Sequence, residues 1–213
     1  MPVLPRPGVR GTFDAIAEEF DASRRDPWPA VVRFAEGLER GSRVLDLGCG
    51  NGRHLRVLAT TGARGAGLDA SRALLGKARD AGPVVQGDLV HLPFRDHAAD
   101  ACLLIACVHH LGTEAERIAC LREARRVVRP GGRLLATAWA LEQSRFAHLS
   151  PTGPALGTDA LVPWKRSVGP PVERFYHLFA EGELERLLGS AGWAVRRFMR
   201  EEDNYIAEGR HDG

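Results

Sequence analysis

The sequence predicts an α/β domain built on a mostly parallel β-sheet. Short apolar runs typical of strands alternate along the chain with segments that have helical spacing. The apolar run 44–47 leads into a loop with three alternating glycines, Gly48, Gly50 and Gly52, a residue type that tolerates positive φ. Near the end of the chain a predicted helix is followed by two short strands, which fits a closing antiparallel pair.

The individual elements follow from the same patterns. Helical spacing covers most of the first forty residues and is interrupted at Pro27 and Pro29, on either side of Trp28. The predicted strands span residues 43–47, 64–68, 83–86, 101–108 and 133–139. The predicted helices span residues 53–60, 71–80 and 113–128, and the last of them stops at a turn over 129–132. The tail predicts a helix at 181–190 and strands at 193–198 and 204–208.

The chain length predicts a single domain. With 213 residues, the chain fits one α/β domain with modest additions. We expect residues 1–11 to form a flexible leader, because they contain three prolines and no apolar signal-peptide core. Residues 12–213 then form the domain. Residues 141–175 are rich in Pro, Gly and Ser without a clear period, which predicts an insertion at the carboxyl end of the fifth strand, where such sheets bind ligands.

Composition argues against several classes of protein. The net charge of +2 at pH 7 does not by itself indicate a nucleic-acid binder. The chain has no apolar run of about 18 residues, so we expect no membrane span. The cysteines have no CxxC spacing, which predicts reduced thiols in a cytoplasmic protein and no metal site. They are Cys49, Cys102, Cys107 and Cys120.

The glycine loop and three acidic residues indicate a ligand. A glycine loop alone also fits an ordinary turn, and a nicotinamide dinucleotide site needs a glycine where Arg53 stands. Asp46 precedes the loop, and Asp69 and Asp88 follow the next two strands. A carboxylate at 69 suits two ribose hydroxyls, and one at 88 suits an adenine amino group. Because unpaired carboxylates near a core are costly, these acids favour a bound ligand, and their pattern is typical of S-adenosylmethionine (SAM) sites.

Rarer strings outside the glycine loop narrow the assignment. They are SRRDPWP at 23–29, IACVHH at 105–110, WALEQ at 139–143, LVPW at 161–164 and RFYHLF at 174–179. From about Phe13 to Ala207 the chain thus resembles the class I SAM-dependent methyltransferases and, within them, the tRNA wobble-uridine carboxymethyl methyltransferases of the Trm9 and AlkB-homologue type. It departs from that family in a short segment at 165–173, where eukaryotic members carry a long basic insertion. It also departs near the end of the chain, where the family pattern R-D-N-W-W is replaced by EDNYI at 202–206, without the arginine.

The resemblance implies a fold, a reaction and a cofactor. The fold is the Rossmann-like class I methyltransferase fold, a mostly parallel seven-stranded sheet in the order 3-2-1-4-5-7-6 with helices on both faces. The reaction is methyl transfer from SAM to a carboxymethyl group on the wobble uridine of tRNA. A carboxylate with a pKa of about 4 is already ionised at neutral pH, so the site needs positioning and no general base. The implied cofactor-binding residues are Asp46, Gly48, Cys49, Gly50, Asp69, Ala70, Asp88, Leu89 and Ala106.

Two residues are expected to act on the acceptor. Arg24 matches a family active-site arginine, and a guanidinium fits a carboxylate in a fork; without the resemblance it reads as a solvated surface arginine. His110 matches a family active-site histidine and is expected to bind the uracil or the carboxylate, although many histidines are structural. Trp139, Glu142 and Gln143 follow the fifth strand and are expected to line the uridine pocket. Trp139 fits a base-stacking role and a core position equally well.

The resemblance also implies partners besides the anticodon region of tRNA. Enzymes of this type work with a small zinc-binding activator, Trm112. The third strand, at 82–86, is short, apolar and placed at a sheet edge, which invites an added strand; the alternative is an ordinary edge protected by Pro83. Two other functions stay open: a SAM-dependent methyltransferase acting on a small carboxylic acid, and a SAM-binding module without catalysis.

Overall fold

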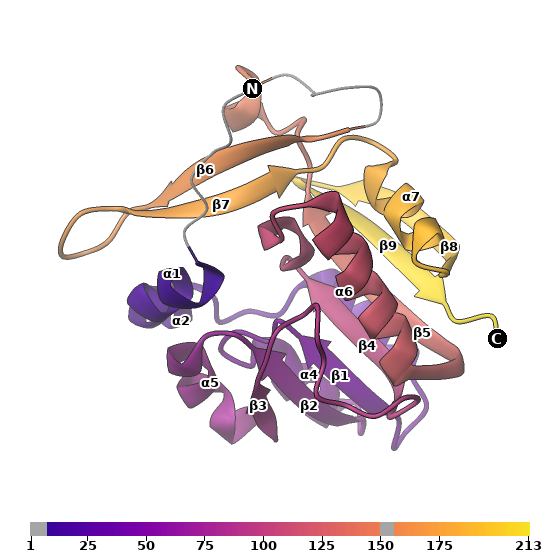
Figure 1. Cartoon of the computed structure of the whole chain (residues 1–213). Coiled ribbons are helices and arrows are strands. Elements are labelled where there is room, and N and C mark those ends of the chain that lie inside the picture. The colour runs from indigo at the N-terminus through magenta and orange to yellow at the C-terminus, as the bar shows by residue number, and fades with distance from the viewer. Residues whose placement is uncertain (1–7, 150–155) are drawn as a thin grey trace.

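A seven-stranded sheet runs through the centre of the computed structural model, which describes residues 8–149 and 156–213 (Figure 1). Its strands are β1 (Arg43–Leu47), β2 (Arg64–Asp69), β3 (Val84–Gln86), β4 (Ala99–Ile105), β5 (Val128–Trp139), β8 (Ala194–Glu201) and β9 (Asn204–Arg210). The spatial order is β3-β2-β1-β4-β5-β9-β8, and β9 is antiparallel to both its neighbours. Counted within this sheet alone the order is 3-2-1-4-5-7-6, as predicted. The labels differ because two further strands precede β8 in the chain.

Helices cover both faces of the sheet. Residues of α3 (Pro29–Glu36), α4 (Arg53–Thr60) and α5 (Arg72–Ala78) pack into one apolar cluster with β1 and β4. Residues of α6 (Glu114–Val127) and α7 (Glu183–Ser190) pack into a second cluster on the opposite face. The predicted helices at 53–60, 71–80, 113–128 and 181–190 are therefore confirmed. The described part of the chain contains no helix with the length and apolar composition needed to cross a bilayer.

The longest helix shows how local sequence sets these elements. Thr113 accepts a hydrogen bond from the backbone N–H of Glu116, and the Glu116 carboxylate accepts one from the backbone N–H of Thr113. This reciprocal cap fixes the start of α6. The helix ends at Val127, and β5 begins at the next residue. The turn predicted over 129–132 is a bulge within β5, where the register shifts between the pairs Ala99–Val128 and Ala101–Arg133.

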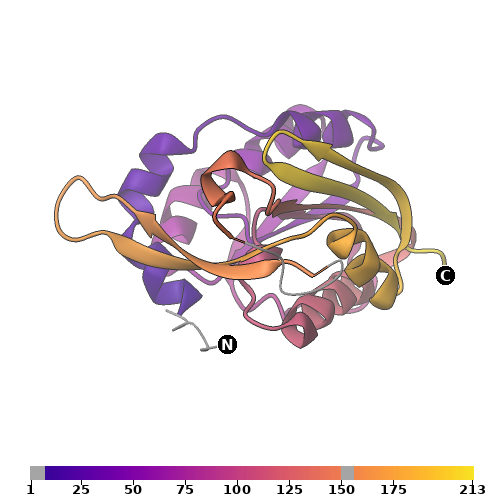
Figure 2. The same cartoon turned by 90° about the horizontal axis from the view of Figure 1, so that it is seen from above.

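The segment 141–175 contains regular structure that the sequence did not predict. Strands β6 (Thr158–Trp164) and β7 (Val172–Leu178) form an antiparallel hairpin outside the main sheet. Figure 2 shows this hairpin extending past the sheet beside the helices α1 (Val9–Ala15) and α2 (Ala17–Ser23). Residues 150–155 of the predicted insertion and 1–7 of the predicted leader lie outside the described residues. Because α1 begins at Val9, the last part of the predicted leader is helical, and the domain boundaries stay a prediction.

A sharp turn follows β4, where the sequence predicted strand up to residue 108. Ala106 adopts a positive φ of 53°, and its N–H donates to the Oγ1 of Thr137 at 2.9 Å. The chain then enters a short 3-10 helix, Val108–His110. A non-glycine residue in this conformation costs energy and is frequent at functional sites. The turn brings two histidines to the carboxyl end of the sheet.

Candidate active site

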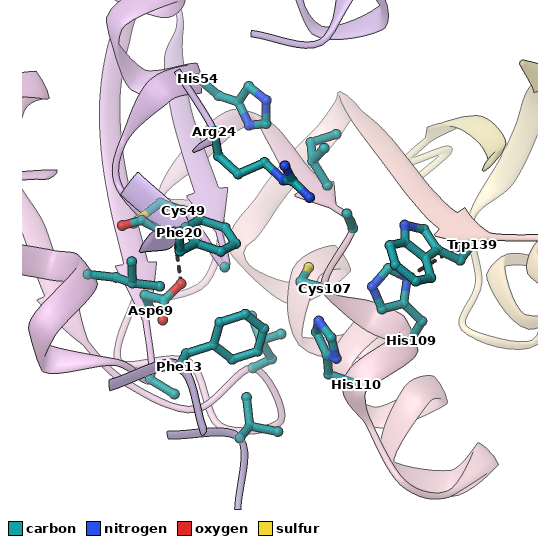
Figure 3. Close-up of a pocket in the computed structure, with 18 of the residues that line it drawn as sticks. Phe13, Phe20, Arg24, Cys49, His54, Asp69, Cys107, His109, His110 and Trp139 are labelled. Carbon is teal, nitrogen blue, oxygen red and sulfur yellow. Dashed lines mark hydrogen bonds between the residues drawn. The ribbon is translucent and has the colours of Figure 1, made fainter. Parts of the chain in front are cut away.

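A cavity of about 1160 Å³ lies at the carboxyl ends of β1, β2, β4 and β5. The glycine loop after β1, helices α1 and α2, the turn after β4 and strand β7 all contribute to its wall. In Figure 3, Asp69, Cys49 and Phe20 lie on one side of the open space, and His110, His109 and Trp139 lie on the other. Residues far apart in the sequence therefore converge here because parallel strands end at the same edge of the sheet.

The glycine loop has the conformation that its sequence requires. Gly48, Gly50 and Gly52 have φ values of +82°, +55° and +78°. A Cβ on Gly48 would lie 2.7 Å from the Cβ of Cys107, and one on Gly52 would lie 3.0 Å from the Cβ of Ala78. Only Gly50, whose Cβ would meet the Phe20 ring at 3.4 Å, is limited mainly by its backbone conformation. The loop is thus shaped by close packing beneath it as well as by the cavity.

The acidic residues occupy different depths. Each oxygen of Asp69 accepts one backbone N–H, from Gly50 and from Ser71, both at 2.8 Å. Burial raises the pKa of Asp69, while these hydrogen bonds oppose the increase. Asp88 lines the cavity and accepts the N–H of Val90 at 3.1 Å. Asp46 is fully buried and outside the cavity wall, and burial raises its pKa to about 7. Its role in binding the cofactor stays a prediction.

The residues present fit SAM. A carboxylate oxygen holds two lone pairs, so both oxygens of Asp69 keep capacity for the hydroxyls of a ribose. The aromatic residues Phe13, Phe20 and Trp28 line the cavity, and their faces favour a sulfonium cation. All the predicted cofactor residues except Asp46 are part of the wall. They are Gly48, Cys49, Gly50, Asp69, Ala70, Asp88, Leu89 and Ala106.

Arg24 lines the cavity and retains most of its donors. Its side chain makes one hydrogen bond to the described residues, from Nη1 to the backbone oxygen of Ser23 at 3.3 Å. The backbone of Arg24 is held by Asn51, whose amide donates at 2.9 Å to the Arg24 carbonyl and at 2.9 Å to Oδ1 of Asp21. In Figure 3 the Arg24 guanidinium points toward the middle of the open space. The glycine loop therefore positions the arginine that the sequence predicted for the acceptor.

The two histidines have opposite tautomers. Nδ1 of His110 lies 2.9 Å from the carbonyl oxygen of Phe175, so this nitrogen must carry the proton and Nε2 is an acceptor. Burial lowers the pKa of His110 to about 4, which keeps the ring neutral at pH 7. Nδ1 of His109 accepts the N–H of Trp139 at 3.2 Å, so its Nε2 carries the proton. Both rings line the cavity, and His110 also contacts the ring of Phe13.

Of the three residues predicted for the uridine pocket, Trp139 lines the cavity, and Glu142 and Gln143 do not. Trp139 lines the cavity, but its ring stacks on Tyr176 at 4.2 Å and carries the guanidinium of Arg145, also at 4.2 Å. Glu142 is exposed, and its carboxylate accepts the hydroxyl of Tyr205 at 2.8 Å. The Gln143 amide is buried and donates to two backbone carbonyls. Glu142 and Gln143 are outside the cavity wall, and both have hydrogen-bond partners within the protein. Their role in a uridine pocket stays a prediction.

Sequence reasoning gave no role to the hairpin residues Arg174 and Tyr176, although both line the cavity. They lie two apart on β7, and Nη1 of Arg174 donates to Oη of Tyr176 at 2.7 Å. Both belong to the string RFYHLF, which carried part of the family resemblance and was the one available signal. The cavity therefore has a cofactor side made by the sheet and a second side made by the hairpin and the segment around Arg24.

Comparisons with known proteins agree with this geometry. Residues 45–136 match the family model described as "Methyltransferase domain". A relative from Schizosaccharomyces pombe, named tRNA (carboxymethyluridine(34)-5-O)-methyltransferase, is 34% identical over 94% of this chain and 95% of its own length. A Xenopus tropicalis relative of the same name, alkbh8, is 33% identical over 95% of this chain, which spans only 40% of that relative.

Solved structures show the fold. A Haloferax volcanii methyltransferase in complex with the Trm112 activator superposes with a TM-score of 0.72, at 20% identity, over 97% of this chain and 98% of its own. The CcbJ methyltransferase from Streptomyces caelestis superposes with a TM-score of 0.73, at 18% identity, over 99% and 100%. The fold, the SAM-compatible cavity and the similarity to the fission yeast relative over nearly its whole length lead to one conclusion. The chain belongs to the class I SAM-dependent methyltransferases, in the family of the tRNA (carboxymethyluridine(34)-5-O)-methyltransferases.

Proposed function

We propose that this chain methylates the carboxymethyl group of 5-carboxymethyluridine at wobble position 34 of tRNA, giving the methyl ester. The observation that carries the proposal is the guanidinium of Arg24, which has no carboxylate partner among the described residues and lies on the wall of the cavity that also contains the glycine loop and Asp69. An arginine fork binds a carboxylate in a defined orientation. The activity for which the relatives are named indicates the acceptor, and the placement of Arg24 supports it.

The residues of the chain position the acceptor rather than activate it. Bound SAM supplies an electrophilic methyl group, and the acceptor carboxylate is already ionised at neutral pH. Arg24 orients that carboxylate, which is the main requirement of a transfer that needs alignment. Because His110 is neutral and offers Nε2 as an acceptor, it suits the N3–H of uracil better than a carboxylate oxygen.

The test is methyl transfer to defined RNA. The protein, with and without a Trm112-type activator, is incubated with methyl-labelled SAM and tRNA that carries 5-carboxymethyluridine, and the nucleosides are then analysed. We expect label in the methyl ester of the wobble uridine. Label that appears in a small carboxylic acid but never in RNA would instead support the alternative function.

Matched variants connect the activity to the site. Arg24→Ala removes charge-assisted hydrogen bonds and should lower kcat/KM by about 10- to 100-fold, with SAM affinity largely unchanged. Arg25→Ala is the control, because Arg25 is exposed and outside the cavity wall. His110→Ala should also lower turnover without loss of SAM binding. If either cavity variant abolished SAM binding, the assigned roles would be wrong.

We also propose an activator of the Trm112 type, a small zinc-binding protein, at the β3 edge. Among the described residues, strand β3 pairs only with β2, and Val85 on it is 36% exposed, which leaves a short apolar edge open to strand addition. Val85→Asp should reduce co-purification with such an activator. Val168→Asp is the control, since Val168 is 80% exposed on the distant hairpin tip. A fully active protein that purifies alone would contradict this partner.

The compartment proposed for this activity is the cytoplasm. The four cysteines are all free and buried, and burial raises the pKa of Cys49 and Cys120 well above the ordinary range. Thiols of this kind are unreactive and are typical of a reducing compartment. Fractionation of cells that express the tagged chain would test the location.

A further inference from the structure

The cavity wall contains a second arginine whose charge no carboxylate of the described residues neutralises. Arg174 is only 7% exposed, lies on β7 and lines the cavity. Its guanidinium makes one hydrogen bond to the described residues, from Nη1 to Oη of Tyr176, and its buried Nε has no partner among them. Its surroundings within the described chain provide no ion pair with a carboxylate. A buried guanidinium without a counter-charge is costly, so this position needs an explanation.

The neighbours of Arg174 increase this cost. The Cζ of Arg174 lies 4.8 Å from the centre of the Trp164 ring, and the Cζ of Arg24 lies 5.5 Å from the same centre. Two guanidinium groups therefore share one indole. Burial lowers the pKa of Arg174, and the positive charges of Arg24 and Arg145 add to this effect. An arginine stays protonated even so, which leaves a concentration of positive charge in the wall.

Tyr176 adds a donor to this cluster. Its phenol oxygen accepts the hydrogen bond from Arg174, so its own O–H remains available for donation. Burial raises the pKa of Tyr176, which keeps the hydroxyl protonated. Its ring is fixed by stacking on Trp139, with an interplanar angle of 18°. The cluster thus offers hydrogen-bond donors from Arg174, Tyr176 and Arg24, which is the composition of an anion site.

We propose that Arg174 and Tyr176, together with Arg24, form an anion subsite that binds the carboxylate of the acceptor and selects acceptors by their negative charge. The inference rests on the proposed function and adds the residues that distinguish a charged acceptor from a neutral one. A phosphate of the acceptor nucleotide has the same anionic chemistry, so the experiment must separate these two sources.

The test compares three anticodon stem-loop RNAs that differ only at position 34. One carries 5-carboxymethyluridine, one carries the neutral 5-carbamoylmethyluridine of the same shape, and one carries uridine. Binding is measured by fluorescence anisotropy with S-adenosylhomocysteine present. We expect the wild-type protein to prefer the charged RNA over the neutral one by about 10- to 100-fold, the range for hydrogen bonds to charged groups. Arg174→Gln should remove most of this preference, with the remainder supplied by Arg24, and leave the affinity for the two RNAs that lack a carboxylate at position 34 within about twofold.

The control variant is Lys165→Gln, which removes one positive charge from the exposed part of the same hairpin. It should leave the preference for the charged RNA intact. Arg174→Lys keeps the charge without the fork and should retain part of the preference. Tyr176→Phe keeps the stacked ring and loses only the hydroxyl, and it should reduce the preference several-fold. It therefore tests the subsite even if Arg174→Gln does not fold, which S-adenosylhomocysteine affinity and melting temperature report.

The outcomes separate the possible errors. If Arg174→Gln weakens all three RNAs equally, the arginine binds a backbone phosphate, and the carboxylate assignment is overturned. If the variant keeps the full preference for 5-carboxymethyluridine, the subsite itself is overturned. A wild-type protein that transfers no methyl group to the carboxymethyl RNA contradicts the proposed function instead, so the two failures are distinguishable.

Discussion

Replacing His177 by glutamine should destabilise the protein in a pH-dependent way. His177 lies on β7, with Nδ1 2.8 Å from Asp159 and Nε2 2.8 Å from the fully buried Glu183 at the start of α7. Although burial alone lowers the pKa of His177, its hydrogen bonds to the two carboxylates raise the value above normal. The buried Arg117 opposes this increase. His177⁺ therefore joins the hairpin to α7 through a charged contact.

The size and sign of the effect follow from this contact. Removing one member of a buried ion pair costs about 3–5 kcal/mol, and glutamine keeps one donor, so we take the lower end. For a chain of this length each kcal/mol lowers the melting temperature by about 2–4 °C, which gives a loss of about 10 °C. Because the folded pKa of His177 is raised, its stabilisation is complete below pH 6.5 and is lost as the pH rises through the folded pKa. The loss caused by His177→Gln should therefore be larger at pH 6 than at pH 9.

Thermal melting at pH 6 and pH 9 measures this difference. Asp159→Asn is the control, because the Asp159 side chain is 38% exposed and solvent screens its interaction, so its loss should be smaller. Glu183 should not be used for this comparison, since its carboxylate also accepts the N–H groups of Gly157 and Ala180. A His177→Gln loss that is the same at both pH values would refute the assignment of a charged histidine.

Three further predictions concern the cavity. Asp69→Asn should weaken S-adenosylhomocysteine binding by about 10-fold or more in calorimetry, because ribose hydroxyls lose a charged acceptor. Gly50→Ala should lower the melting temperature by about 4 °C, since alanine at φ +55° costs about 1–2 kcal/mol; an unchanged melting temperature would show that the loop relaxes. Glu142→Gln should leave kcat/KM within about twofold, because Glu142 bonds Tyr205 outside the cavity. A larger loss would restore Glu142 to the acceptor site.

The sheet and its helices were predictable because their residues follow local rules. Apolar runs located the strands, and helical spacing located the helix at 113–128, whose start is fixed in the structure by the cap between Thr113 and Glu116. Strand β7 was not predicted from the sequence, because both of its faces are buried and carry polar residues, Arg174 and His177, which interrupt the apolar pattern. The end of β4 was predicted too late because the apolar run continues to Val108. The turn at Ala106, with its positive φ, depends on a hydrogen bond to Thr137, which is distant in the sequence.

The two sides of the site differ in the same way, because local sequence sets one and tertiary folding sets the other. The cofactor side lies within one local motif and the ends of adjacent strands, so all the residues predicted for it line the cavity except Asp46, which lies deeper. Their roles in binding the cofactor stay predictions. The acceptor side is assembled from α2, the turn after β4 and the hairpin, which meet only after folding. Glu142 and Gln143 were placed by their proximity in sequence to β5, and that proximity does not determine where the chain points. Arg174 carries no local signal beyond the family string.

Asn51 connects the two sides and offers a way to separate them. It belongs to the glycine loop, is 2% exposed, and uses its amide donor to hold both Asp21 and the carbonyl of Arg24. Asn51→Ala should therefore release the Arg24 segment and raise the KM for tRNA by about 30-fold, from the loss of two hydrogen bonds at about 1 kcal/mol each. Asp69 keeps its own bonds to the loop, so S-adenosylhomocysteine affinity should stay within about twofold. An affinity loss as large as that of Asp69→Asn would instead assign Asn51 to the cofactor, and the coupling between the loop and the acceptor arginine would have to be abandoned.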